Sequence, residues 1–234
     1  FVNACGAGFH SQLMPDQTLD IGFSATAMHY VSEKPCQIPN HVHMVGASGS
    51  ALDAFSLQAR DDWSRILLSR SAELKPGGRL VFMNFGIDED GRYLGNTGGI
   101  NMFNTFNDIW CELHQERLIT HDEWVDATFS QFYRTQEEFC APLVEPSSKI
   151  YQSGLRLVSA HTGVVKCPYR AAYEAAGDAM STQEFAASYI PTLRSWSETV
   201  FATALDSSRP EDARAALVDL FYQRYEDRVA ADPA

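Results

Sequence analysis

Thr18–Phe23 (TLDIGF) and Arg79–Phe85 (RLVFMNF) are two short, largely apolar stretches that decide the fold of this chain. Such runs are typical of strands buried on both faces of a parallel sheet. Residues 51–74 lie between them and carry apolar side chains at helical spacing, and Pro76–Gly78 follows as a helix stop. The order strand, helix, strand predicts a βαβ unit whose right-handed crossover places both strands parallel in one sheet.

The position of a ligand site follows from this arrangement. Ligands of open parallel sheets bind beyond the carboxyl ends of the strands. We therefore expect the site to include residues that follow Phe23 and Phe85, the latter opening a polar, glycine-rich loop at Gly86–Gly99.

The rest of the chain is predicted to be mainly helical. Apolar periodicity indicates helices at about 101–117, 181–205 and 211–230, with Pro191 expected to kink or divide the second. Thr135 resembles a helix cap in TQEEF. Leu155–Val165 (LRLVSAHTGVV) is predicted to be a further strand.

Composition limits the class of protein. The chain has 234 residues, of which 45% are hydrophobic and 21% charged, which suits one sizeable core or a core with a small cap. A net charge of −12 repels phosphate backbones, so we expect no nucleic-acid partner. We expect no membrane span, since no apolar run approaches the ~18 residues that a bilayer requires. Five scattered cysteines without a C-x-x-C pair favour reduced thiols in a cytoplasmic protein.

The first 35 residues carry a family resemblance. They resemble the SABATH family of S-adenosylmethionine-dependent methyltransferases, plant and bacterial enzymes that act on salicylate, benzoate, jasmonate, related small acids and xanthine alkaloids. The matching residues, in order, are Gly8-Phe9-His10, Leu13-Met14-Pro15, Thr18-Leu19-Asp20, Ser24-Ala25-Thr26, Met28-His29-Tyr30-Val31-Ser32 and Pro35. The match continues through Asp53-Ala54-Phe55 and Glu73–Val81, the latter common to many class I methyltransferases.

The resemblance implies an α/β fold, a class I methyltransferase Rossmann-like sheet with a helical substrate-binding cap. Residues 1–100 would belong to the core, 101–150 to the cap, and 151–234 to the remaining core strands and the C-terminal helices. The family's glycine-rich cofactor loop and ribose-binding acid would lie upstream of Phe1, and its last strand beyond Ala234. We therefore expect the sheet to be incomplete, from about the third strand onward, with a missing N-terminal segment of the same protein as a partner and a homodimer left open.

The resemblance also assigns candidate substrate residues. His29 and Tyr30 match the family's His-Trp pair, which holds the substrate carboxylate, and a tyrosine hydroxyl can donate as indole does. Thr26 stands where the family often has tyrosine, which widens the pocket. The aromatic side chains expected to wall it are those of Phe103, Phe129 and Phe132, with Trp110 and Tyr133 as further candidates. The alternatives are a packed His-Tyr pair and ordinary core aromatics.

Candidate cofactor residues follow in the same way. Gly8 and Phe9 match the family's Ser-Phe beside the adenine of S-adenosylmethionine, and an aromatic face suits a purine. Ser24 and Ala25 would line its methionine moiety. A glycine turn with a core phenylalanine, and a simple turn serine, are the alternatives. His41-x-His43 with Cys36 lacks the spacing of a closed zinc site, so no metal is expected.

The function predicted from this resemblance is S-adenosylmethionine-dependent O-methylation of a carboxylate on a small aromatic or fatty acid. A carboxylate of pKa about 4 is already ionised near neutrality, so no general base and no catalytic residue are assigned. The alternatives are an N- or other O-methyltransferase on the same scaffold, and a non-catalytic fragment that pairs with a missing segment.

One test follows from the expected upstream position of the cofactor loop. The 234 residues alone should bind S-adenosylmethionine weakly or not at all, because the loop and the ribose-binding acid would be lacking. Isothermal titration calorimetry checks this, and micromolar affinity would contradict it.

Overall fold

The computed structural model describes residues 2 and 4–233 of the chain. Their contacts group into two units. The sheet unit comprises Phe1–Cys36, Ser48–Leu94 and Ser130–Gly163, and the helical unit comprises Gln37–Ala47, Gly95–Phe129 and Val164–Ala234. The division of the chain at residues 100 and 150 stays a prediction, because it concerns the roles of the segments rather than their contacts.

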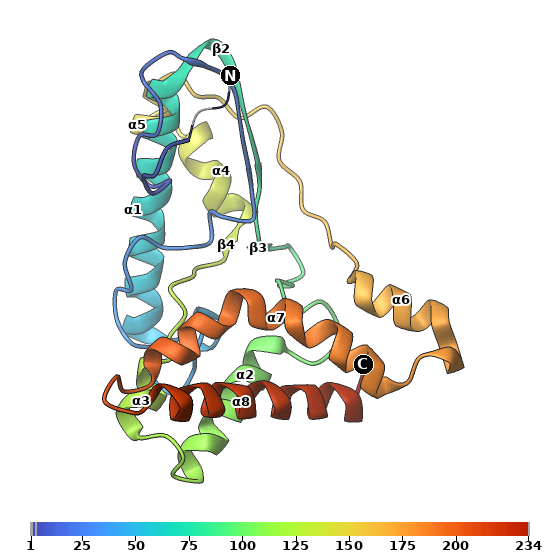
Figure 1. Cartoon of the computed structure of the whole chain (residues 1–234). Helices are drawn as coiled ribbons and strands as arrows, with labels where there is room; N and C mark the ends of the chain where they lie inside the picture. The colour runs from blue at the N-terminus through green and yellow to red at the C-terminus, as the bar shows by residue number, and fades with distance from the viewer. Residues whose placement is uncertain (1, 3, 234) are drawn as a thin grey trace. The chain divides into compact units, whose positions relative to one another are not determined.

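The predicted βαβ unit forms the centre of the sheet unit. Strand β1 (Leu19–Ala25) leads, after an intervening segment, to helix α1 (Gly49–Glu73), which passes directly into strand β2 (Leu74–Met83). The two strands pair in parallel, with Phe23 opposite Val81, and Figure 1 shows α1 running beside them. The expected parallel strands and their helical crossover are confirmed.

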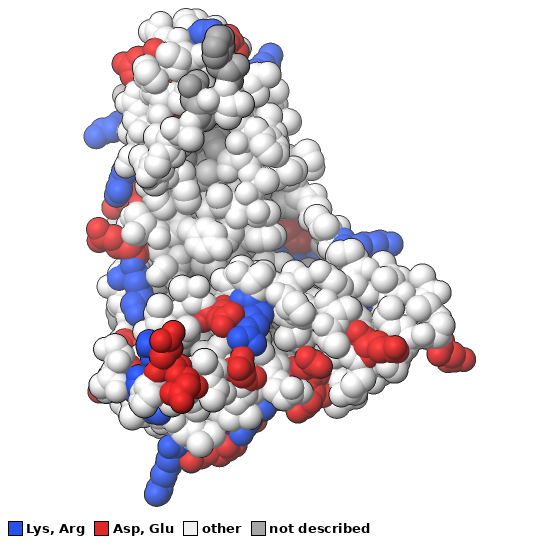
Figure 2. Space-filling view, in the orientation of Figure 1, with Lys and Arg blue, Asp and Glu red and all other residues white. Residues whose placement is uncertain are grey.

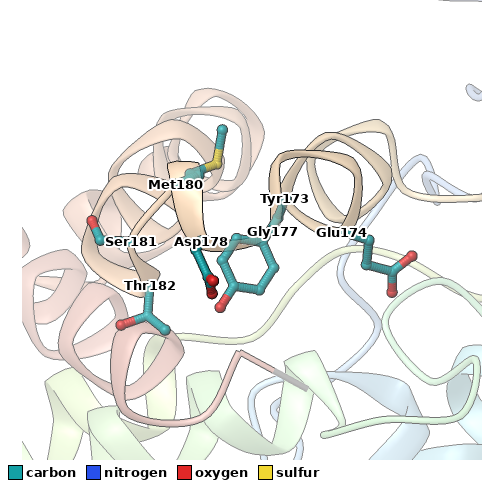
Figure 3. Close-up of a pocket in the computed structure, with 7 residues that line it drawn as sticks. All are labelled: Tyr173, Glu174, Gly177, Asp178, Met180, Ser181 and Thr182. Atoms are coloured by element: carbon teal, nitrogen blue, oxygen red, sulfur yellow. The ribbon is translucent and has the colours of Figure 1, made fainter.

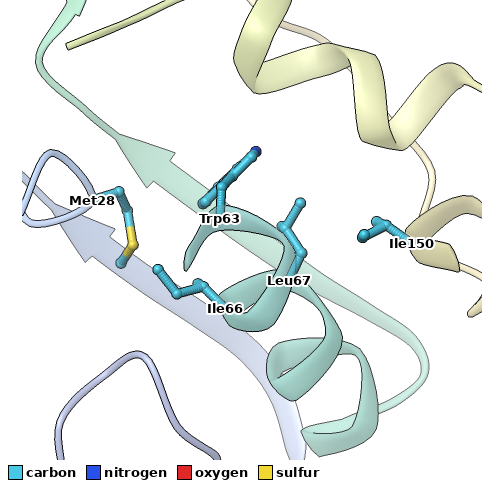
Figure 4. Packing of buried hydrophobic residues seen from close by; sticks show 5 residues of the cluster. All are labelled: Met28, Trp63, Ile66, Leu67 and Ile150. Atoms are coloured by element: carbon cyan, nitrogen blue, oxygen red, sulfur yellow. The ribbon is translucent and has the colours of Figure 1, made fainter. Parts of the chain in front are cut away.

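One face of this strand pair packs against α1. The ring of Phe82 on β2 meets Trp63 of α1 edge to face, with centroids 5.3 Å apart. Figure 4 shows the cluster that this packing belongs to, made of Met28, Trp63, Ile66, Leu67 and Ile150. Full burial of one such side chain stabilises the fold by about 1.5–3 kcal/mol, so this cluster holds α1 on the sheet.

The opposite face of the strand pair is apolar and exposed. Ile21 and Phe23 on β1 are 68% and 66% exposed, and Val81 and Met83 on β2 are 48% and 55% exposed. These residues alternate along the strands with the ones that face α1, as a pleated strand requires. The sequence predicted strands buried on both faces, and among the described residues burial is achieved on one.

A second, smaller pair of strands lies beyond β2. Strand β3 (Gly86–Ile87) pairs in parallel with β4 (Arg134–Thr135), which leads into α4 (Gln136–Val144), and α5 (Lys149–Gln152) follows. The predicted cap at Thr135 is confirmed, since its hydroxyl accepts from the backbone N–H of Glu138 and the Glu138 carboxylate accepts from that of Thr135.

The predicted strand at Leu155–Val165 is wrong for the described chain. Residues 155–167 form neither helix nor strand, and Val158 is 77% exposed. A strand requires a neighbouring backbone to pair with, whereas the carbonyl of Ala160 accepts a bond of 3.5 Å from the side chain of Gln136. Apolar alternation alone therefore did not produce a strand here.

The helical unit contains the remaining helices. They are α2 (Met102–Gln115), α3 (His121–Asp126), α6 (Pro168–Ala176), α7 (Thr182–Ala204) and α8 (Glu211–Ala231), with short 3₁₀ turns at Met44–Gly46 and Gly177–Ala179. The three long helices predicted by periodicity are confirmed. Pro191 lies inside α7 and does not divide it.

Helices α7 and α8 pack side by side (Figure 1), with the rings of Phe201 and Phe221 at 4.1 Å between them. On the surface, Figure 2 shows acidic and basic side chains next to one another over these helices. One group of ion pairs on α7 and α8 joins Arg194 to Glu198 and Asp219. In the part of the chain that the structure describes, no helix has the length and apolarity that crossing a membrane demands.

The close approach of β3 and β4 gives a test of the fold. A Cβ atom added to Gly86 would lie 2.8 Å from the backbone oxygen of Arg134, so Gly86→Ala should force the two strands apart. We expect the free energy of unfolding to fall by about 1–3 kcal/mol, as overpacking usually costs, measured by urea denaturation. Gly163→Ala is the control, because a Cβ there meets nothing within 4 Å. Equal stability of the two variants would contradict the described pairing.

Candidate functional site

The carboxyl end of β1 is strained. Thr26, the first residue after the strand, has a φ of 51° and donates its backbone N–H to the carbonyl of Met83 at the end of β2, at 2.7 Å. Left-handed backbone is rare for a β-branched residue and costs of order 1–3 kcal/mol, and such strain concentrates at functional sites. This strain turns the chain sharply at the edge where the sequence predicts a ligand.

His29 and Tyr30 lie at this edge beside residues that follow β2. The His29 side chain is buried, with 3% exposure, and Tyr30 is 38% exposed. The His29 ring lies 4.2 Å from that of Tyr30, 5.0 Å from Phe85 and 5.9 Å from Tyr133, measured between centroids. The segments after β1 and β2 therefore meet, as the sequence predicted, and form a largely aromatic surface around one histidine.

The segment around His29 is fixed by a neighbouring stretch of backbone. Val31 donates its N–H to the carbonyl of Ser130 at 3.0 Å, and Tyr30 forms an antiparallel bridge with Gln131. Phe132, one of the predicted pocket residues, donates its N–H to the carbonyl of His29 at 2.7 Å. Its side chain is 5% exposed. These bonds place Phe132 next to the His29–Tyr30 pair within the sheet unit.

A buried carboxylate holds the far end of the same segment. Asp62 of α1 is fully buried and accepts hydrogen bonds of 2.7 Å from both the backbone N–H and the hydroxyl of Ser32. Burial acts to raise the pKa of Asp62, but the bonds from Ser32 lower it below its ordinary value. Asp62 is therefore ionised near neutrality and ties Ser32 to α1.

The His29 imidazole is neutral near neutral pH. Burial, and then the positive charge of Arg134, lower the pKa of His29 to about 4. Its Nδ1 atom is buried and has no hydrogen-bond partner among the described residues. An unsatisfied buried polar atom costs about 1–3 kcal/mol.

The four predicted cofactor residues also lie in the sheet unit. The segment that carries Gly8 and Phe9 is held by a buried ion pair of α1, because Arg70 donates to the carbonyls of Phe9 and Ser11 at 3.0 and 2.7 Å. Its partner Glu73 accepts from the backbone N–H groups of residues 13 and 14 at 2.5 and 3.2 Å. Gly8 is exposed, and Phe9 is half-buried with its ring 4.1 Å from that of His10.

Ser24 and Ala25 occupy opposite faces of β1. Ser24 is half-buried on the side of α1, opposite Phe82 in the strand register, whereas Ala25 is exposed beside Met83. Both lie at the carboxyl end of the strand. Their predicted role toward a cofactor stays a prediction.

Phe103 and Phe129 belong to the helical unit instead. Both are fully buried, with their ring centroids 5.9 Å apart, and the His43 ring stacks on Phe103 at 3.8 Å. His43 therefore packs as an aromatic ring, while Nδ1 of His41 lies 2.8 Å from the carbonyl of His43. The two phenylalanines contact a shared cluster of rings, and their role in substrate binding stays a prediction.

A separate hollow of about 460 Å³ lies in the helical unit, between α6 and the start of α7 (Figure 3). No predicted site residue lines it. Its lining contains two carboxylates and no basic side chain, the seven residues being Tyr173, Glu174, Gly177, Asp178, Met180, Ser181 and Thr182. Like charges repel at short range, so this hollow is unsuited to a carboxylate ligand.

Sequence reasoning missed two residues of the site, Asp62 and Arg134. A signal for Asp62 was available, because it lies three residues after Ala59 and four before Ile66, on the buried stripe of the helix. A carboxylate on an apolar stripe indicates a partner in the core. Arg134 follows two aromatic residues, and nothing in the sequence pairs it with Met28.

The lowered pKa of His29 predicts an effect of pH on stability. The unfolded histidine titrates near 6.5, so the unfolded chain binds more protons between pH 6.5 and about 4, and this contribution to stability is lost as pH falls through that window. Between pH 7 and 5 the loss should be roughly 2 kcal/mol. His29→Gln should abolish it in urea denaturation at both pH values, whereas the exposed His161→Gln should keep the wild-type dependence. An unchanged loss in His29→Gln would contradict the buried, neutral imidazole.

Comparison with known proteins supplies the family. The sequence matches the family described as SAM dependent carboxyl methyltransferase over residues 1–231. Jasmonate O-methyltransferase of Arabidopsis thaliana is 32% identical over 101 residues, which is 37% of this chain and 26% of that protein. Indole-3-acetate O-methyltransferase 1 of the same plant is 28% identical over 134 residues, or 53% and 34% of the two chains.

Among solved structures, loganic acid methyltransferase with SAH has a TM-score of 0.70 at 14% identity, covering 97% of this chain and 60% of that one. This likeness confirms the expected class I methyltransferase fold. The chain spans about a quarter to a third of the length of the curated relatives it matches. From the family match over nearly its whole length, the chain belongs to the SAM dependent carboxyl methyltransferase family.

Proposed function

We propose that the protein transfers a methyl group from S-adenosylmethionine to the carboxylate of a small aromatic or fatty acid. The observation that carries this proposal is the buried His29, whose Nδ1 lacks a partner among the described residues at the carboxyl edge of a parallel strand pair. That edge is where ligands of such sheets bind. Family membership supplies the reaction class.

The residues proposed to hold the cofactor are Gly8, Phe9, Ser24 and Ala25. They fit a cationic sulfonium compound in that none carries a positive charge, and Phe9 offers an aromatic ring. A Cβ added to Gly8 would meet nothing within 4 Å, apart from its chain neighbours, so space is open at Gly8. When bound, S-adenosylmethionine supplies an electrophilic methyl group on a positively charged sulfur.

The protein's contribution to the reaction is to bind and orient the acid. The carboxylate is already ionised near neutrality, so no side chain has to remove a proton. We propose that His29 and Tyr30 each donate a hydrogen bond to it, leaving one oxygen lone pair directed at the methyl carbon. Holding the reacting atoms in line is the main source of acceleration in such a displacement.

The surroundings of His29 support an aromatic or long-chain acid. The rings of Phe85 and Tyr133 lie beside it, and the backbone of Phe132 binds its carbonyl. We propose that Phe132 and Thr26 also line the pocket, where Thr26 is smaller than an aromatic residue. The relatives are named for jasmonate and indole-3-acetate, and the structural neighbour for loganic acid, all of them carboxylic acids.

We also propose a cytoplasmic location and a covering partner for the protein. The five cysteines are unpaired, which supports the cytoplasm, where thiols stay reduced. The exposed apolar face of β1 and β2 supports a covering partner, either the additional N-terminal segment of the same protein or a second copy in a homodimer. Intact mass and light scattering distinguish these arrangements.

The proposed reaction is tested by incubating the whole protein with methyl-labelled S-adenosylmethionine and a panel of aromatic and fatty acids, with amines and phenols as alternative acceptors. Each acid is paired with its primary amide, which has the same shape and no carboxylate. Label should appear in the methyl esters alone. Label in amine or phenol acceptors instead would assign another methyl acceptor to the site, and no transfer to any acceptor would support a non-catalytic role.

The proposed contact of Tyr30 makes a quantitative prediction. Tyr30→Phe removes one donor and keeps the ring, and the loss of a hydrogen bond to a charged group costs about 1.5–3 kcal/mol, or roughly ten- to a hundredfold in kcat/KM. The affinity for S-adenosylmethionine and the melting temperature should barely change. Tyr151→Phe on α5 is the matched control. A normal kcat/KM for Tyr30→Phe on every accepted acid would rule out the role of its hydroxyl.

A further inference from the structure

Arg134 is a buried arginine that bridges two parts of the sheet unit. Its side chain is 2% exposed. One guanidinium nitrogen, Nη1, donates to the carbonyl of Met28 at 2.5 Å, and the other, Nη2, donates to the carbonyl of Ala59 in α1. The guanidinium also lies over the rings of Trp63 and Phe139, 5.9 and 5.5 Å from their centroids.

The bond to Met28 is one of several hydrogen bonds between residues 130–134 and the segment after β1. Ser130 and Phe132 bind Val31 and His29 through backbone groups. Arg134 binds the carbonyl of the residue that directly precedes His29, and it does so with a side chain anchored on α1. The peptide plane between Met28 and His29 is rigid, and the next plane is held by the bond from Phe132 to the carbonyl of His29. Fixing both planes fixes the direction in which the His29 side chain leaves the backbone.

We propose that Arg134 is a positioning residue for the acid substrate: its guanidinium fixes the Met28 carbonyl, and thereby His29 and Tyr30, and its buried positive charge favours an anion in front of them. This proposal rests on the proposed function, since it assumes that His29 and Tyr30 bind the carboxylate. Arg134 itself is buried, donates to two backbone carbonyls, and is not assigned a contact with the substrate.

The charges around Arg134 and His29 support this role. The carboxylates that act on Arg134 are those of Asp62 and Glu138, and although burial lowers the pKa of Arg134 to about 10, it stays charged at neutral pH. The titratable rings beside His29 are Tyr30 and Tyr133. Burial raises the pKa of Tyr133, so that ring is neutral. Burial is the main cause that keeps His29 unprotonated, and the positive charge of Arg134 adds to it. The same positive charge would attract a carboxylate.

Two substitutions separate the effect of the charge from that of the hydrogen bonds. Arg134→Met keeps an apolar stem between Trp63 and Phe139 and removes the charge and both donors. Arg134→Lys keeps a charge but cannot present two nitrogens in the fixed geometry of a guanidinium. Arg65→Met is the control. Arg65 lies on α1 with its Nη2 atom 3.5 Å from Oδ1 of Asp62, and its half-exposed side chain donates nothing to residues 28–32.

The experiment combines steady-state kinetics with an NMR titration of the His29 ring, assigned by comparison with His29→Gln. For Arg134→Met we expect KM for the acid to rise at least tenfold, the dissociation constant for S-adenosylmethionine to change less than twofold, and the pKa of His29 to rise by about one unit. Arg134→Lys should raise KM similarly while the pKa of His29 stays low. Arg65→Met should change neither quantity.

KM for the acid and the pKa of His29 test the role of Arg134 separately from the proposed function. If no acid is methylated, the proposed function fails, while a raised His29 pKa in Arg134→Met still upholds the link between Arg134 and His29. If acids are methylated and KM is unchanged in both Arg134 variants, the positioning role is overturned. Circular dichroism monitors folding, and if Arg134→Met does not fold, an unchanged KM in Arg134→Lys overturns the role by itself.

Discussion

The buried face of α1 carries apolar side chains that pack on the sheet, and it also carries three charged ones, Asp62, Arg70 and Glu73. A charge inside a protein is tolerated when it is paired or hydrogen-bonded. Arg70 and Glu73 pair with each other and bind backbone groups of the segment before β1, whereas Asp62 binds Ser32 in the segment after β1. These bonds therefore hold two loops without regular secondary structure in place on α1.

The two loops carry the residues proposed to bind the cofactor and the substrate. Arg70 and Glu73 hold the segment with Phe9, which is proposed to meet the cofactor, and Asp62 holds the end of the segment with His29. Arg134 donates to the carbonyl of Met28 in the second of these loops, and it also binds α1 through the carbonyl of Ala59. The two proposed binding segments thus share one rigid support, which suits a reaction whose rate depends on alignment.

The electrical state of the site suits the proposed chemistry. A protonated histidine would bind a carboxylate strongly but would also repel a positively charged sulfonium. A neutral imidazole avoids that repulsion and still donates one hydrogen bond in the appropriate tautomer. In the proposed arrangement the permanent charge is carried by the buried Arg134, which would attract an anion while the His29 ring stays neutral.

The sequence by itself determined the βαβ unit, the long helices, the cap at Thr135 and the neighbourhood of the site, because hydrophobic period, capping chemistry and strand order are local properties. The resemblance added His29 and Tyr30. The tertiary structure decided the left-handed turn at Thr26, the neutrality of His29 and the pairing of Arg134 with Met28, 106 residues apart. It also decided that residues 155–167 form no strand, whatever their apolar pattern. Burial, strain and backbone pairing depend on segments that only folding brings together, and so no local pattern encodes them.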